Sequence, residues 1–240
     1  MAYPFGLTTQ AIRDVFSEEI NAVGGTVSDT FDDGDRLFTR SVLAPVHEVR
    51  PKDRMQGGVA LRATAQEIRV HPYLFRQVCR NGAIIAQAIQ TRQIELENVS
   101  PPNVTEVVIE LREAIRECCS PEVFSSNVDA MRTASEREAD FALQLLPMLC
   151  RLPQSHASRL ITEIMKRFGA EKDHSALGLV NAVTSLARET SDPEMRWELE
   201  ELGGGIPALL RPSPRVDDEG LEMVVSVTCS GSLEEMRRRA

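Results

Sequence analysis

The pattern of apolar residues changes at Pro101-Pro102, and this change restricts the chain to folds that combine a sheet with helices. Before it, several short runs alternate apolar and polar side chains, as strands do. After it, apolar residues recur at helical spacing. Because strand-like and helix-like segments are segregated along the chain, the sequence predicts the α+β class, with an N-terminal antiparallel sheet unit packed against a mainly helical C-terminal half.

The predicted sheet unit covers residues 1–97 and begins with a helix over Thr8–Val23, which Thr8 or Thr9 can cap and Gly24-Gly25 ends. A turn at Asp32–Asp35 contains an Asp-Gly pair and joins two strand-like runs, which predicts a hairpin. The predicted strands are Thr26–Phe31, Arg36–Leu43 with Val46–Arg50 as a continuation, Val59–Thr64 and Glu67–Tyr73.

The second part, residues 98–240, contains six predicted helices with polar residues near their starts. We interpret Gly203–Gly205 as a helix stop and turn, because glycine favours helix ends. A last strand over Met223–Cys229 is expected to return to the sheet, so that both parts pack as one body. The predicted helices are Val104–Cys118, Pro121–Met131, Ser135–Cys150, Ser155–Phe168, Ser175–Arg188 and Pro193–Leu202.

Membrane and secretory segments are not expected. No apolar run reaches the roughly 20 residues that span a bilayer. The first residues lack the basic and apolar regions of a secretory signal. The five cysteines are an odd number with one adjacent pair, Cys118-Cys119, which does not suit a disulfide framework. These features predict a cytoplasmic protein.

Residue patterns for catalysis, metals and cofactors are not found. The four histidines are scattered and no C-x-x-C pair occurs, so we expect no metal site. A phosphate-binding glycine loop and a G-x-S-x-G nucleophile turn are also missing, and we expect no cofactor. The sequence therefore favours a non-enzymatic protein. A ligand cleft between the sheet and the helices would reopen the question of an enzyme.

Charge is unevenly distributed in a chain whose formal net charge is −9. Residues 50–92, the basic segment, contain eight basic and two acidic residues, whereas residues 93–150 are acidic. Strand spacing places Arg69, His71 and Tyr73 on one face, and arginines with a stacking ring are typical of single-strand binding. The alternative is the polar face of an ordinary sheet. The candidate nucleic-acid-binding residues are Arg62, Arg69, Tyr73, Arg76 and Arg80.

Two stretches of the chain carry a family resemblance. The first runs from Pro51-Lys52-Asp53 through Gly57–Arg62 to Phe75–Gly82, with its Arg-x-Val-Cys-x-Asn-Gly signature, and the second is Asn181–Thr184. Together they resemble the phage- and plasmid-associated family called domain of unknown function 932. Family members often have Asn-Ser-Glu after the Gly-Val strand, where this chain departs from the pattern with Ala63–Glu67.

The resemblance implies no settled chemistry. Genes of this family occur beside phage and plasmid genes, which suggests a role in DNA replication or recombination. This suggestion rests on association and gives no mechanism. In the signature, we expect Cys79 to be buried and inert and Asn81-Gly82 to form a tight turn with positive φ at the glycine. The positions that carry the signature are Asp53, Gly58, Cys79, Asn81, Gly82 and Asn181.

Two functions follow as hypotheses. The first is a non-enzymatic mobile-element protein whose basic segment binds single-stranded DNA or another polyanion, with salt-dependent affinity. The alternative is an interaction or homo-oligomerising module without nucleic-acid affinity. A further possibility is that the arginines pair within the chain, with acidic residues of the first helix after Pro101-Pro102: Glu106, Glu110, Glu113 or Glu117.

Overall fold

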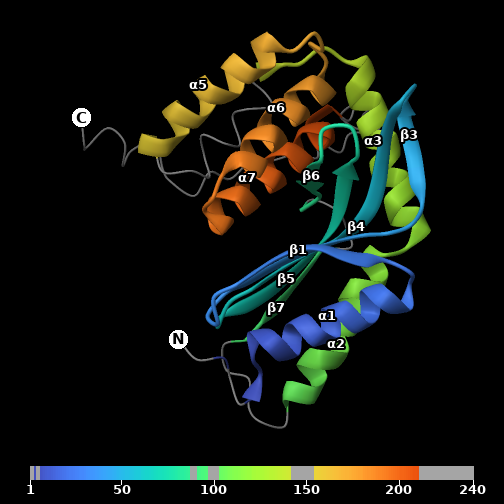
Figure 1. Ribbon diagram of the computed structural model, residues 1–240, viewed down its shortest axis with the longest axis vertical. Coiled ribbons are helices and arrows are strands. Elements are labelled where there is room, and N and C mark those ends of the chain that lie inside the picture. The colour runs from blue at the N-terminus through green and yellow to red at the C-terminus, as the bar shows by residue number, and fades with distance from the viewer. Residues whose placement is uncertain (1–2, 4–5, 87–90, 97–102, 142–153, 211–240) are drawn as a thin grey trace, which may run out of the picture.

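The computed structural model describes residues 3, 6–86, 91–96, 103–141 and 154–210. A curled antiparallel sheet comes from the N-terminal half, and the helices belong mostly to the C-terminal half, which confirms the predicted α+β class (Figure 1). In the described part, no helix is long and apolar enough to cross a membrane. The predicted boundary at residue 97 and the predicted strand Met223–Cys229 lie outside the described residues.

The sheet is built around a long hairpin of two strands, β4 (Asp53–Ala63) and β5 (Glu67–Arg76). On the outer side of β4, β2 (Leu37–Val42) pairs with one end and β3 (Val46–Arg50) with the other. On the outer side of β5, β7 (Arg92–Glu95) pairs with the first part of the strand and β6 (Asn81–Ile84) with the last part. The remaining strand, β1 (Thr26–Asp32), pairs with β2.

Local signals place several of the elements. Helix α1 (Thr9–Ala22) begins where the Thr8 side chain accepts a hydrogen bond from the backbone N–H of Ala11. It ends at Ala22, and Gly24, just beyond the end, has a φ of +73°. In the β1–β2 turn, Asp33 accepts backbone hydrogen bonds and Gly34 has a φ of +88°. The predicted start and end of the first helix and the predicted Asp-Gly turn of the hairpin are therefore confirmed.

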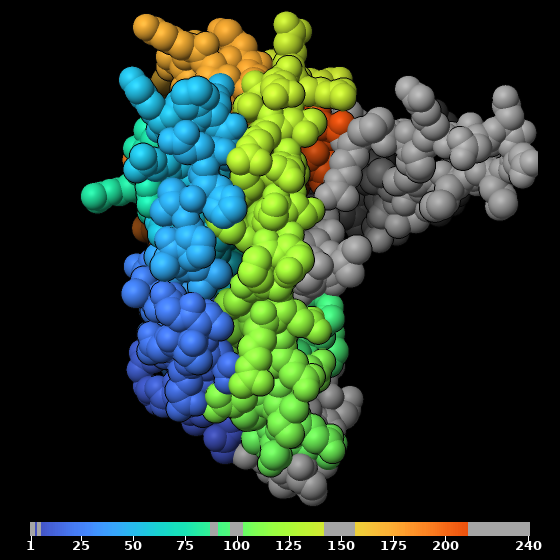
Figure 2. Space-filling view, turned by 90° about the vertical axis from the view of Figure 1, so that its right-hand side faces the viewer, coloured from blue at the N-terminus to red at the C-terminus, as the bar shows by residue number. Residues whose placement is uncertain are grey.

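In the described part of the chain, two large apolar cores and a smaller one around Trp197 lie on the sheet. One large core packs α1 and α2 (Val104–Cys118) beneath the end that carries β1 and β7. The other large core packs α3 (Pro121–Glu136), α5 (Gln154–Ala170), α6 (Ala176–Glu189) and α7 (Pro193–Gly205) against β3, β6 and the adjoining ends of β4 and β5. Figure 2 shows α2 and α3 following each other along one face, with α1 beside α2 and β3 beside α3. A short 3-10 helix, Ile206–Leu210, follows α7.

The C-terminal helices correct two predictions. Helix α3 extends to Glu136, so Ser135 ends one helix and does not begin the next, and residues 142–150 of the predicted helix lie outside the described residues. Gly203–Gly205 do not leave the helix as predicted; they are buried and form the last residues of α7. A Cβ on Gly204 would lie 2.0 Å from the backbone oxygen of Ile84, so glycine lets α7 approach β6.

The prediction of a turn at Asn81-Gly82 is wrong. These residues begin β6, where Gly82 lies opposite Phe75, and the turn precedes them at residues 77–80. The left-handed conformation falls on Arg80, with a φ of +54°. Gly82 is needed for space, because a Cβ there would lie 1.7 Å from the hydroxyl oxygen of Tyr73. This packing depends on the strand partner, which the local sequence does not indicate.

Candidate functional site

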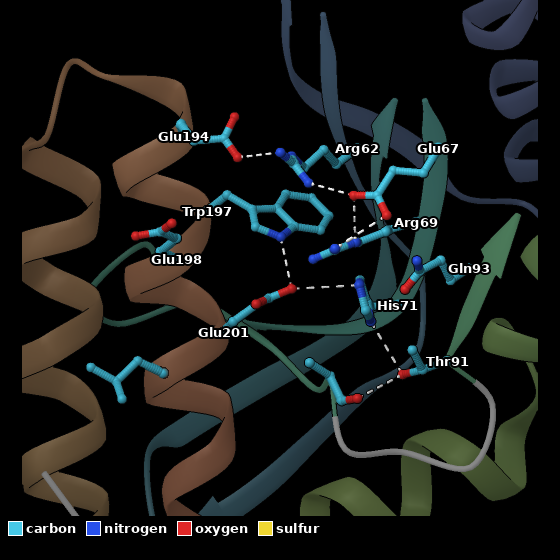
Figure 3. Close-up of a pocket in the computed structure, with 12 residues that line it drawn as sticks. Arg62, Glu67, Arg69, His71, Thr91, Gln93, Glu194, Trp197, Glu198 and Glu201 are labelled. Carbon is cyan, nitrogen blue, oxygen red and sulfur yellow. Dashed lines mark hydrogen bonds and ion pairs between the residues drawn. The ribbon is translucent and has the colours of Figure 1, made fainter. Parts of the chain in front are cut away.

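A pocket of about 540 Å³ opens between the sheet and α7 (Figure 3). Its volume falls in the range of small-molecule sites. Strands β4, β5 and β7 form one wall and α7 forms the other. The lining residues are Arg62, Glu67, Arg69, His71, Ala86, Thr91, Gln93, Glu194, Trp197, Glu198, Glu201 and Leu202.

The sheet wall carries two arginines that are neutralised within the chain. Arg62 on β4 lies directly opposite Arg69 on β5. Both contact Glu67, with 2.9 Å from Nη1 of Arg62 to Oε1 and 3.1 Å from Nη2 of Arg69 to Oε2. Arg62 also forms an ion pair with Glu194 of α7. This cluster therefore bridges the sheet and the helix and carries no net charge.

The α7 wall is acidic. Glu194, Trp197, Glu198 and Glu201 occupy one face of the helix, at spacings of three, four and seven residues. The indole N–H of Trp197 donates to Glu201 at 2.8 Å. Within the described part of the chain, no hydrogen bond or ion pair reaches the carboxylate of Glu198. Burial raises the pKa of Glu198, and the nearby carboxylates of Glu194 and Glu201 raise it further.

His71 lies on β5 with its side chain 4% exposed. Burial and then the charge of Arg69 lower its pKa to about 4, so the ring is neutral at pH 7. The Thr91 hydroxyl lies 3.3 and 3.2 Å from the backbone oxygens of Ile85 and Ala86, to which it can only donate. It must then accept from Nδ1 of His71, 3.1 Å away. We therefore assign the proton to Nδ1.

This tautomer leaves Nε2 of His71 as a bare acceptor. Nε2 is buried, has no hydrogen-bond partner, and lies 3.5 Å from Oε1 of Glu201, as Figure 3 shows. Two acceptors cannot bond to each other. Among the described residues, no donor therefore reaches Nε2 from the α7 wall.

Acidification should reveal the neutral state of His71. Its folded pKa of about 4 is below the unfolded value of about 6.5, so the unfolded chain binds the proton first as the pH falls. Stability is therefore lost between these two values, by up to about 3 kcal/mol for this residue. Urea unfolding at about pH 7 and about pH 4 should show that His71→Phe loses less stability on acidification than the natural chain. Equal losses in the two proteins would contradict the assignment.

The five candidate nucleic-acid-binding residues do not form one surface. Arg62 and Arg69 line the pocket, whereas Arg76 lies at the far end of β5 and Arg80 in the exposed turn after it. The interpretation of Tyr73 as an exposed stacking ring is wrong. Its side chain is buried with Phe38, Ala60, Ile84 and Trp197, because α7 covers this face of β5.

The signature residues have structural contacts. Asp53 holds Arg76 through two hydrogen bonds of 2.6 and 2.7 Å, and Nη1 of Arg76 lies 3.3 Å from the sulfur of Cys79. Cys79 is half-buried, not buried as predicted, because the turn that carries it lies at the surface. Gly58 allows the close approach of β2, since a Cβ there would lie 1.9 Å from the oxygen of Ser41. Asn81 and Asn181 are buried, on β6 and α6.

Pairing of the basic segment with the acidic helix occurs at one described position, where Arg92 lies 2.6 Å from Glu117 of α2. Arg62, Arg69 and Arg76 pair instead with Glu67 and Asp53 in their own sheet. Nucleic-acid binding stays a prediction that these contacts do not favour, because three of its arginines already have carboxylate partners.

The residues of the α7 wall were not identified from the sequence. Their signal is a helical face that combines three glutamates with the single tryptophan of the chain, at Glu194, Trp197, Glu198 and Glu201. On a surface helix the same pattern is an ordinary solvated face. What makes it a site is its position opposite His71, which is more than 120 residues away in the sequence.

The chain matches no family model, no curated protein and no solved structure. The resemblance to domain of unknown function 932 is therefore still an expectation. In the described part of the chain, no three His, Cys, Asp or Glu side chains are grouped in a way that could hold a metal ion. The function is therefore inferred from the residues of the pocket.

Proposed function

We propose that this chain binds a small organic cation in the pocket between the sheet and α7. The observation that carries the proposal is the buried Nε2 of His71, an acceptor that has no hydrogen bond among the described residues and lies opposite the carboxylates of the α7 wall. Nε2 of His71 is buried without a hydrogen bond, and Glu198 has no partner among the described residues. Buried polar groups are nearly always hydrogen-bonded, so the buried Nε2 of His71 is consistent with a ligand that supplies an N–H donor, whereas the partly exposed Glu198 contributes negative charge.

The charge of the pocket supports a cation. Its lining contains four carboxylates and two guanidinium groups, and His71 is neutral. Arg62 and Arg69 are occupied by Glu67 and Glu194, so the unbalanced negative charge lies on the α7 wall. An ammonium or guanidinium group placed there would relieve the repulsion that raises the pKa of Glu198. It would also donate to both kinds of acceptor.

Calorimetric titration with butylammonium tests this proposal. We expect saturable binding that is at least about tenfold weaker for tetramethylammonium, which has the charge but no N–H donor. Affinity should also fall with decreasing pH, because Glu198 takes up its proton at a higher pH than an ordinary glutamate.

Two variants sharpen the test. Glu198→Gln removes the unpartnered charge and should weaken butylammonium binding about tenfold or more. Glu110→Gln, on an exposed position of α2, should leave it unchanged. Butylammonium that does not bind, or that binds equally well to Glu198→Gln, would contradict the proposal.

A further inference from the structure

We infer that the ligand of this pocket is a zwitterion, an amine that also carries a carboxylate, as amino acids do. The inference rests on the proposed function, because it takes the ammonium group to lie at the α7 wall. It adds a second subsite on the sheet wall, formed by the guanidinium groups of Arg69 and Arg62.

The register of the sheet provides the first observation. Arg62 and Arg69 are direct cross-strand neighbours, and like charges in that position repel each other. One carboxylate, Glu67, serves both guanidinium groups. Arg62 has Glu194 as a second partner, whereas among the described residues the ion pairs of Arg69 are to Glu67 alone. The sheet wall therefore places beside the pocket a guanidinium group that shares its carboxylate partner with Arg62.

The accessibility of Arg69 provides the second observation. Its side chain is 34% exposed, compared with 15% for Arg62 and 14% for Glu67. In Figure 3 its guanidinium group extends from β5 toward α7, with Glu201 across from it. A planar guanidinium group with remaining N–H donors binds a carboxylate in a two-pronged geometry. Arg69 can therefore receive an anionic group from the open side of the pocket.

The spacing of the two subsites fits one small molecule. Arg69 and His71 are two residues apart on β5 and face the same side, so their Cα atoms are separated by about 7 Å. The donors of Arg69 and the acceptor of His71 thus lie within the reach of a single amino-acid-sized ligand. One wall favours a cationic group and the other an anionic group, so a ligand that contacts both walls carries both charges.

Paired ligands test the inference. Glycine, β-alanine, γ-aminobutyrate and 5-aminovalerate are titrated against butylammonium and butyrate under the same conditions. We expect at least one amino acid to bind about tenfold tighter than butylammonium, and butyrate not to bind. The number of methylene groups in the amino acid that binds most tightly indicates the distance between the two subsites.

Variants assign the carboxylate subsite. Arg69→Gln should abolish the advantage of the amino acid over butylammonium, and Arg54→Gln, at an exposed position of β4, should preserve that advantage. Arg69→Lys keeps the charge without the planar fork, so it should retain part of the advantage even if Arg69→Gln fails to fold.

The outcomes separate the two proposals. If butylammonium binds and amino acids bind no more tightly, the inference of a zwitterionic ligand is wrong, but the proposed cation site is supported. A preference that survives in both Arg69→Gln and Arg69→Lys would also overturn the inference. If no amine and no amino acid binds, the proposed function itself fails.

Discussion

Arg40→Met is expected to lower the free energy of unfolding by about 3–5 kcal/mol. Arg40 on β2 is 3% exposed, and its Nε lies 2.6 Å from Oε2 of Glu200 on α7, which is 2% exposed. Removing the guanidinium group leaves a buried carboxylate whose remaining partner, Arg196, is 3.1 Å away and partly exposed. Uncompensated buried charge is costly because the interior cannot solvate it. Chemical denaturation at neutral pH measures the loss.

A rescue and a control separate this effect from lost packing. Combining Arg40→Met with Glu200→Leu removes both charges and should recover most of the stability, since apolar replacements of buried pairs are often neutral. Arg36→Met breaks an exposed pair with Asp33 and should cost less than about 1 kcal/mol. A loss from Arg40→Met as small as that of Arg36→Met would show that the buried pair contributes little.

Gly204→Ala is expected to destabilise the protein by about 2–3 kcal/mol, because the added Cβ would overlap the backbone of β6. The contact is 2.0 Å to the oxygen of Ile84, and a backbone oxygen in a strand cannot move aside as a side chain does. Helix α7 would have to shift away from the sheet. Since α7 forms one wall of the pocket, butylammonium affinity should fall together with the melting temperature.

Gly169→Ala provides the matched control for this substitution. Gly169 also lies near the end of a helix, α5, but a Cβ there meets nothing within 4 Å. This change should be neutral or should stabilise by up to about 1 kcal/mol, from helix propensity alone. If both substitutions have the same effect, the close approach of α7 to β6 is not what requires Gly204.

Local signals in the sequence were sufficient for most individual elements. The cap at Thr8, the Asp-Gly turn before β2 and the proline that begins α3 each act through residues close in the chain. Strands β6 and β7 were not predicted because they are short, and β6 is rich in small residues that have little strand preference of their own. They form because β5 offers them a partner.

The class of the fold, the segregation of strands from helices and most helix starts can be predicted from the sequence, because they depend on periodicity and on neighbouring residues. In contrast, the carboxylate partners of the arginines, the burial of Tyr73 under α7 and the position of His71 opposite the acidic helix depend on how the elements pack. Arg40 and Glu200 are 160 residues apart, and no local pattern relates them. The physical reason is that charge compensation and burial act over a few ångströms in space, whatever the separation along the chain.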